Sequence, residues 1–144
     1  MLLPGLFGEV GVVEPALAKA LMAIPAARAV EFGRGTKASQ MRGSEHNDTW
    51  SETDDGPKPT GIRADGALGG MATGGDLFVM VHFKPPSSIS QSQNTLNLAS
   101  GEEEELVVLG RHDPVIAPRA VAVVESSARL VLSDLSLQGG WSNE

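Results

Sequence analysis

The 144-residue sequence contains no cysteine. This absence excludes a disulfide framework and any thiolate site, and it is typical of a cytoplasmic protein, which is the localisation we expect. No run of about 18 apolar residues is present, so we expect no membrane span. The opening residues, MLLPGLFGEVG, lack a basic segment and a sustained apolar core, which argues against a signal peptide.

Positive charge is also scarce. The sequence has 11 Lys and Arg residues and 18 Asp and Glu residues, for a net charge of −7. This balance argues against a nucleic-acid surface, so any bound phosphate must rely on local cations and backbone amides. The length and the hydrophobic content of 41% suit a single globular domain over residues 1–144.

The pattern of apolar residues predicts an α+β fold. Leu17, Leu21 and Ile24 have the spacing of a short helix over 15–24, and ARAVEFG at 27–33 is typical of a brief strand. A second, longer helix is predicted over 118–137, with its apolar side chains on one face and a Glu125–Arg129 pair on its surface. Helices mixed with separate strands favour an antiparallel sheet packed with helices.

Between these elements the sequence predicts a long loop and two further strands. Ten of the 17 glycines lie between Gly33 and Gly75, so 34–75 is predicted to be a Gly-rich loop. DLFVMVHF at 76–83 is almost continuously apolar, which indicates a strand buried on both faces. We expect it to pair with a second strand at 105–110, which follows a solvated acidic turn at 102–105, and the 118–137 helix to pack on their sheet.

Two stretches could hold an anion, although each has a plainer interpretation. GALGGMATGG at 66–75 could present backbone N–H groups to an anion, but on its own a flexible turn explains it better. FKPPSSI at 83–89 places a lysine, rigid prolines and serine hydroxyls after a buried strand. That arrangement suits a clasp for a polyanion and a surface loop about equally well.

GRHDPVIAPRAVAVVE at 110–125 has two interpretations as well. Asp113 followed by Pro114 is a common way to begin a helix, because the carboxylate accepts bonds from free N–H groups. The same arginine, histidine and aspartate could form the edge of an active site. Composition alone favours the helix start.

Histidines elsewhere give no strong sign of a metal site, and we predict none. His46 lies near Glu45 and Asp48, but the spacing fits no usual ligand pattern, so a polar loop is the better interpretation. His82 lies within an apolar strand, where a hydrogen-bonded core or interface histidine is more common than a catalyst.

Taken together and in order, these stretches resemble the C-terminal part of chorismate synthase. The matching runs are ALAKALMAIPAARAVEFG, GSEHND, GALGGMATGGDLFVMVHFKPPSSI and GRHDPVIAPRAVAVVES, and they cover most of positions 14–137. Each run is weak alone, but four of them in the family's order and spacing are specific. The resemblance implies a β-α-β sandwich of which this chain is one part.

The resemblance also implies an enzyme of the shikimate pathway. The family is a lyase that converts 5-enolpyruvylshikimate 3-phosphate to chorismate by an anti-1,4-elimination of phosphate, and it requires reduced FMN. Family members are cytosolic homotetramers, or plastid proteins in plants. They are more than twice as long as this chain, and their N-terminal part carries the catalytic histidines. We therefore expect this chain alone to be incomplete and inactive.

Position by position, the resemblance assigns roles to residues of this chain. Asp113 matches the acid that assists proton transfer, and Arg111 matches an arginine at the flavin and the substrate. The remaining matches are to flavin-binding residues: Pro25, Ala26, Gly69, Lys84, Pro85, Pro86, Ser87 and Ser88. Asp113 is expected both to cap the helix and to face the cofactor.

Two functions remain open on the sequence alone. The chain is either the C-terminal portion of an enzyme that works with its missing half, or a non-catalytic remnant that binds flavin or a phosphorylated ligand. Coding sequence for the histidine-bearing half directly upstream would favour the enzyme.

Overall fold

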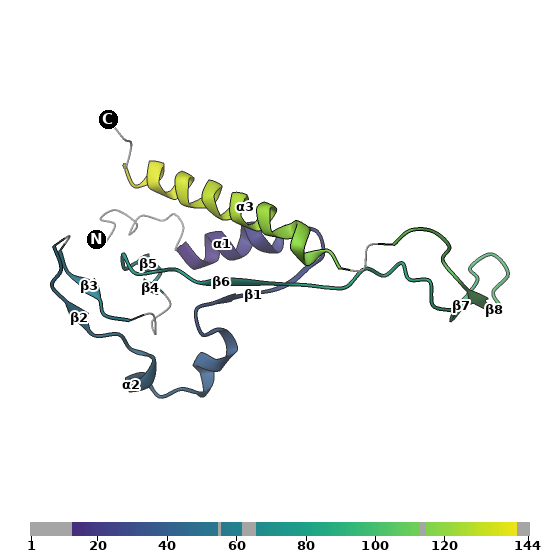
Figure 1. Cartoon of the computed structure of the whole chain (residues 1–144), viewed down its shortest axis with the longest axis horizontal. Helices are drawn as coiled ribbons and strands as arrows, with labels where there is room; N and C mark the ends of the chain where they lie inside the picture. The colour runs from purple at the N-terminus through teal and green to yellow at the C-terminus, as the bar shows by residue number, and fades with distance from the viewer. Residues whose placement is uncertain (1–12, 55, 62–65, 113–114, 141–144) are drawn as a thin grey trace.

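The computed structural model describes residues 13–54, 56–61, 66–112 and 115–140. A body of two helices and a strand pair carries two short hairpins, and a hairpin arm extends from it (Figure 1). The elements, in chain order, are α1 (Val13–Met22), β1 (Ala27–Phe32), the 3₁₀ helix η1 (Gly35–Gln40), α2 (Gly43–His46), β2 (Trp50–Ser51), β3 (Lys58–Pro59), β4 (Ala67–Leu68), β5 (Met71–Ala72), β6 (Val79–Phe83), β7 (Gln93–Leu96), β8 (Glu103–Leu106) and α3 (Ala117–Gln138). This mixture of helices and antiparallel strands confirms the predicted α+β class.

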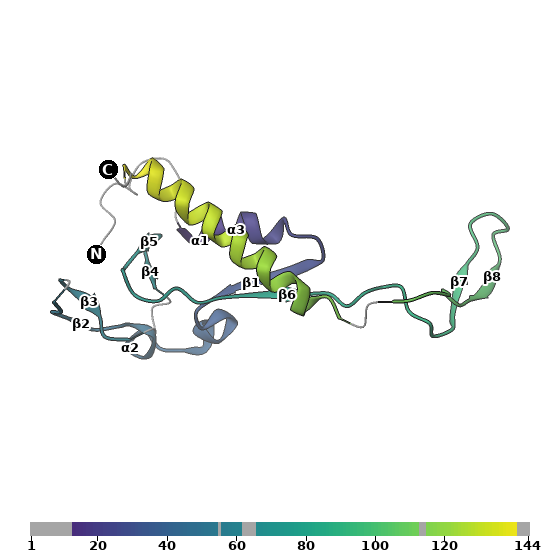
Figure 2. The ribbon, with the colours of Figure 1, turned by 45° about the horizontal axis from the view of Figure 1, so that its top comes forward.

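The core lies where α1 and α3 cover one face of the β1–β6 pair (Figures 1 and 2). Val13, Leu17 and Leu21 of α1 and Leu135 of α3 are buried together. The strands add half-buried side chains to this cluster from alternate positions, since successive strand residues point to opposite faces. From β1 and β6, the side chains in the cluster are Val30, Phe32, Val79 and Val81.

β6 pairs with β1 in antiparallel register, with Val30 opposite Val81 and Phe32 opposite Val79. The prediction that 76–83 pairs with 105–110 is therefore wrong. Residues 107–110 form no strand, and β8 pairs instead with β7, through a turn in which the Gly101 N–H donates to the Asn97 carbonyl at 2.8 Å. Pairing two strands joined by a short turn costs less chain entropy than closing a longer loop.

Three further expectations differ from the structure. The acidic run is not a turn, because Glu103–Leu106 form β8. β6 is covered on one face only, since Met80 on the other face is 59% exposed. The 34–75 segment is not a featureless loop, because it contains η1, α2 and two hairpins, β2–β3 and β4–β5, with strands of two residues each.

The two predicted helices are confirmed to within two residues at each end, and the Glu125–Arg129 pair is present at 2.6 Å. The expectation that Asp113 caps the long helix is wrong. Ile116 is the N-cap of α3 and Pro118 lies in its first turn, so the helix begins beyond the Asp113–Pro114 pair. Asp113 and Pro114 themselves lie outside the described residues.

Candidate functional site

The turn after α1 and the end of β6 lie side by side. Ala26 has a left-handed backbone, with φ of 69°, which turns the chain from Pro25 into β1. The Ala26 carbonyl accepts a hydrogen bond from the Lys84 N–H at 2.9 Å. Two of the predicted binding stretches, 58 positions apart in the sequence, are thus joined directly.

The KPPSS segment borders a hollow of about 310 Å³ at the end of β6. Pro85 and Pro86 end the strand because proline cannot donate to a ladder. The hollow is lined by Pro85, Pro86, Ser88, Ile89, Ser90, Gln91 and His112. Serine hydroxyls and an amide give it donors for phosphate oxygens, and Lys84, which is exposed, begins the same segment.

The segment before α3 reaches this hollow through His112. The His112 Nε2 lies 2.9 Å from the Val108 carbonyl, so that nitrogen is the donor and the ring is held in place. Arg111, which is exposed, precedes it. The predicted catalytic residue Asp113 follows it but lies outside the described residues.

Ser90 and Gln91 line the hollow although the sequence does not predict them as site residues, whereas Ile89 and His112 belong to the candidate stretches 83–89 and 110–125. The only signal at Ser90 and Gln91 is their position directly after FKPPSSI. That position does not indicate a lining residue until the hollow itself is known.

Gly69 is not brought to this hollow. It lies in the turn of the β4–β5 hairpin, with φ of 59°, and nothing lies within 4 Å of the position a Cβ would take. In both ribbon views this hairpin lies beyond the first residue of β6, whereas Lys84 follows the last (Figures 1 and 2). Among the described residues, Gly69 thus lies at the opposite end of β6 from the other predicted site residues.

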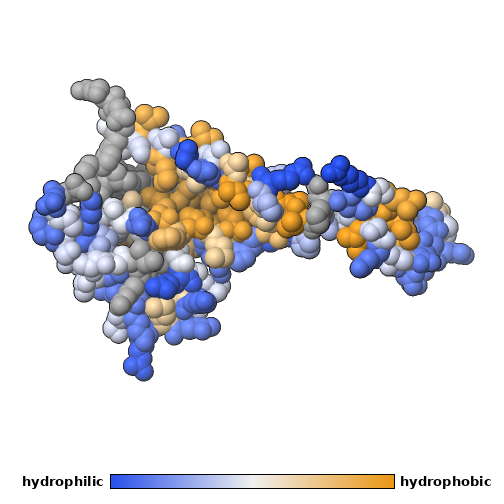
Figure 3. All heavy atoms as spheres, viewed as in Figure 1, coloured by the Kyte–Doolittle hydropathy of each residue, from blue (hydrophilic) through white to orange (hydrophobic). Residues whose placement is uncertain are grey.

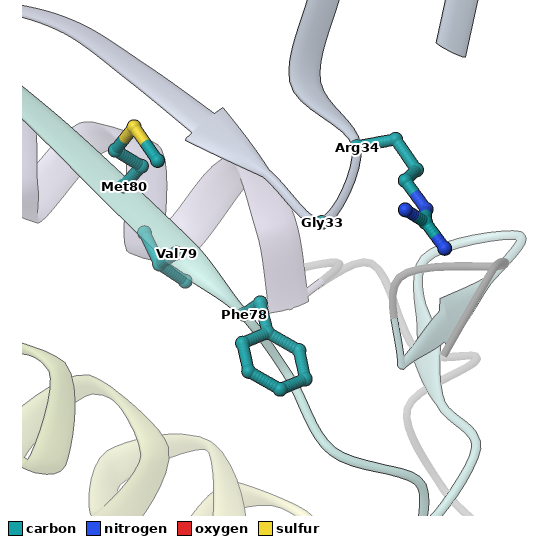
Figure 4. Close-up of a pocket in the computed structure, with 5 residues that line it drawn as sticks. All are labelled: Gly33, Arg34, Phe78, Val79 and Met80. Carbon is teal, nitrogen blue, oxygen red and sulfur yellow. The ribbon is translucent and has the colours of Figure 1, made fainter. Parts of the chain in front are cut away.

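A second hollow, of about 220 Å³, contains none of the predicted residues. Gly33 and Arg34, which follow β1, line it together with Phe78, Val79 and Met80 of the β6 region (Figure 4). The Gly33 N–H donates to the Phe78 carbonyl at 2.8 Å and closes this end of the strand pair. Its lining offers one guanidinium and is otherwise apolar side chains and backbone, whereas the hollow beside KPPSS offers two serine hydroxyls, an amide and an imidazole.

The prediction that His82 is hydrogen-bonded is confirmed. Its Nε2 lies 3.2 Å from Oε2 of Glu31 on the neighbouring strand. This bond, followed by the one from the Thr36 N–H, lowers the pKa of the Glu31 carboxyl. His82 is not a core residue, because its side chain is 47% exposed. The pair therefore links β1 to β6 on the face that the helices leave open.

Over the described part of the chain, no group of three or more histidine, aspartate or glutamate side chains could hold a metal ion. His46 and Glu45 lie in α2, where the Glu45 carboxylate accepts the Arg42 N–H at 2.7 Å. Among the described helices, none is long and apolar enough to cross a membrane.

The chain resembles proteins of one family over most of its length. A sequence profile described as chorismate synthase matches residues 7–137. Curated chorismate synthases from Methanopyrus kandleri and Dehalococcoides mccartyi are 50% and 46% identical, over 97% and 89% of this chain. These matches cover 36% and 35% of the relatives, so the chain spans about a third of their length.

Comparison of folds points the same way. A crystal structure of a chorismate synthase superposes with a TM-score of 0.64, covering 85% of this chain and 29% of that one. The sequences are 24% identical, so the likeness supports the shared fold alone. The sequence profile, which extends over most of the chain, decides the relationship: this chain belongs to the chorismate synthase family.

Proposed function

We propose that this chain supplies the C-terminal third of a chorismate synthase, which eliminates phosphate from 5-enolpyruvylshikimate 3-phosphate to give chorismate with the aid of reduced FMN. The observation that carries the proposal is the convergence of Pro25–Ala26, the KPPSS segment and His112 at one end of the β1–β6 pair. All but His112 are positions at which the family resemblance places flavin contacts.

The residues around the hollow fit a phosphorylated flavin. A flavin mononucleotide presents a phosphate, which suits hydroxyl and ammonium donors, and a ring system, which suits flat apolar surfaces. Ser88 and Ser90 line the hollow and offer hydroxyl donors, and Lys84 directly precedes the lining residue Pro85. Pro85 and Pro86 offer the apolar surface. Reduced FMN, when bound, would supply electron density for the departure of phosphate from the substrate.

The chain's own contribution to the reaction is binding and proton movement. The guanidinium of Arg111 can hold a phosphate or carboxylate in bidentate fashion. The elimination breaks a C–H bond and the C–O bond to phosphate and forms a C=C bond, so a proton must leave the substrate. Asp113, a carboxylate close to Arg111 in the sequence, is proposed to relay that proton.

The test is reconstitution with the missing part. The part of the Methanopyrus kandleri relative outside the match would be co-expressed with this chain, and chorismate formation measured with FMN and a reductant. The Asp113→Asn variant should lower turnover by about 10²-fold or more, with flavin affinity nearly unchanged. Absence of chorismate from a stable, flavin-binding complex would contradict the proposal.

The alternative is a non-catalytic remnant that binds flavin or a phosphorylated ligand. It is favoured by one observation, namely that the chain spans about a third of its relatives. Titration of the chain with FMN and with inorganic phosphate, beside the reconstitution, separates the two functions. In the enzyme, we further propose a cytoplasmic homotetramer, as the family resemblance implies.

A further inference from the structure

The segment 107–112 returns from the β7–β8 arm to the body (Figure 1) and contains the predicted site residue Arg111. It belongs to no helix or strand, although the structure describes all of its residues. The side chains of Val107 and Leu109 are 41% and 87% exposed, and nothing lies within 4 Å of the position that a Cβ would take at Gly110. Apolar packing within the described chain therefore holds this segment only weakly, and no strand ladder includes it.

One side chain closes this segment into a loop. The His112 Nε2–H donates to the Val108 carbonyl, four residues earlier, at 2.9 Å. Gly110, midway between them, has φ of 134°, a backbone conformation that suits glycine, and it lets the chain bend back on itself. The imidazole thus does for this loop what a backbone N–H does in a regular turn. Residues 108–112 are here called the His112 loop.

The same imidazole belongs to the hollow beside the KPPSS segment. His112 is half-buried and lines the hollow together with Ser88 and Ser90. Figure 3 shows that hydrophilic side chains lie between the apolar surface of the body and that of the arm, which is the junction where this segment runs. One ring therefore connects the conformation of the His112 loop to the hollow in which a ligand is proposed to bind.

The charge of the chain makes the position of Arg111 important. The hydroxyls and the amide that line the hollow carry no charge, so an anion bound there depends on the cations beside it. Lys84 directly precedes the lining residue Pro85, and Arg111 directly precedes the lining residue His112. The bond from the Lys84 N–H to the Ala26 carbonyl fixes the backbone at the first cation. At the second cation the bond from the His112 ring has this place, and a guanidinium that binds an oxyanion through two parallel bonds requires a defined position.

We propose that His112 is a positioning residue of this site, whose Nε2–H bond to the Val108 carbonyl holds the His112 loop in the conformation that presents Arg111 to the phosphorylated ligand of the hollow. His112 acts through Arg111 and needs no bond of its own to the ligand. The inference rests on the proposed function, in which the hollow takes FMN. It adds a residue and a role that the family resemblance does not assign.

Two substitutions separate the N–H donor from the flat ring. His112→Gln keeps an N–H donor at about the reach of Nε2 and removes the ring, whereas His112→Phe keeps a ring and removes the donor. FMN affinity would be measured by flavin fluorescence in the complex of this chain with the part of the Methanopyrus kandleri relative outside the match. His112→Phe should weaken FMN binding about two- to tenfold, the equivalent of one neutral hydrogen bond, and His112→Gln should bind FMN like the unchanged chain. In an Arg111→Ala background, His112→Phe should cause no further loss, because the arginine that it positions is gone.

The order of the loop is measured without any ligand. In the chain alone, the amide order parameters of Gly110 and Arg111 from nuclear magnetic relaxation should fall to about 0.6 or less in His112→Phe and stay higher in His112→Gln and the unchanged chain. Circular dichroism checks the folding of each variant, and helix content should stay the same because His112 lies outside α1 and α3.

Three results would overturn the inference. The first is weaker FMN binding by His112→Gln with normal binding by His112→Phe, because the ring itself would then contact the ligand. The second is an equal loss from His112→Phe with and without Arg111, and the third is a loop that stays ordered in His112→Phe.

Chorismate formation by the same complexes is recorded separately. FMN binding that depends on the His112 donor through Arg111, in a complex that makes no chorismate, would support the inference and contradict the proposed function. Chorismate formation by a complex in which His112→Phe changes neither FMN affinity nor loop order would do the reverse.

Discussion

At the scale of single residues, Ala26 shows how the predicted site is held. A left-handed conformation costs a non-glycine residue roughly 1–2 kcal/mol, and φ at Ala26 is 69°. The bond from the Lys84 N–H to the Ala26 carbonyl, together with the pairing of Ala27 with Phe83, fixes this turn against β6. The resemblance assigns Ala26 and Lys84 separately, and the strand register explains why they lie together.

Lys84 offers a direct test of the site. Lys84→Ala should weaken FMN affinity by about ten- to a hundredfold, since it removes one charge-assisted contact worth roughly 1.5–3 kcal/mol. Affinity would be measured by quenching of flavin fluorescence in the reconstituted enzyme. Lys37→Ala is the control, because Lys37 is an exposed lysine in η1, at the other end of β1. Equal losses of FMN affinity in the two variants would indicate that the net charge of the protein matters and that Lys84 makes no specific contact.

The Glu31–His82 pair predicts a pH dependence of stability. The hydrogen bond from His82 lowers the folded-state pKa of Glu31 below its usual value of 4.5. The stabilisation of the folded chain by the ionised Glu31 carboxylate should therefore be present above pH 4.5. It should be lost as the pH falls through the lowered pKa. Comparing melting temperatures between pH 7 and pH 3, Glu31→Gln should be less stable at pH 7 and converge with the unchanged chain at low pH. A constant difference across that range would show that the carboxylate charge does not matter.

At the scale of elements, the β4–β5 hairpin depends on its glycines to different degrees. Gly66 has φ of 76°, and a Cβ there would lie 2.4 Å from the Asp76 carbonyl oxygen. Gly69 also has positive φ, but its surroundings are open. Gly69→Ala should cost about 1 kcal/mol from the backbone alone. Gly66→Ala should cost clearly more, because backbone atoms must also move. Urea unfolding measures the loss of stability in each variant. Equal losses of unfolding free energy would show that the Asp76 carbonyl does not crowd position 66.

Elements whose signal lies within a few turns are predictable from the sequence, and long-range pairing is not. The spacing of Leu17 and Leu21 predicts α1, and the apolar pattern of 118–137 predicts α3, because an amphipathic helix is a local pattern. The partner of β6 escapes prediction, since apolar character says that a strand is buried but not beside which strand. Likewise, Ala26 lies beside Lys84 only because β1 pairs with β6 in this register. The sequence does not reveal that register.

At the scale of the whole molecule, the β7–β8 arm and α3 both expose apolar surface. All eight strand residues of the arm are exposed, and an isolated two-stranded hairpin is marginally stable in water. Leu98 and Leu109 on or beside it are 91% and 87% exposed. This chain thus leaves apolar surface open at two separate places, as expected of a part whose relatives are nearly three times as long.

That incompleteness leads to the last prediction, which concerns the chain alone. With FMN, a reductant and 5-enolpyruvylshikimate 3-phosphate, the purified chain should form no measurable chorismate. Proton transfer by a positioned group contributes about 10²–10⁴-fold to a rate, and holding the reactants in geometry contributes more. The groups that the described chain brings to the hollow are chiefly hydroxyls, prolines and His112, and Gly69 lies apart from them at the other end of β6. Chorismate production by the chain, with host enzyme excluded by a parallel purification of the Asp113→Asn variant, would show that this third of the fold carries the whole reaction.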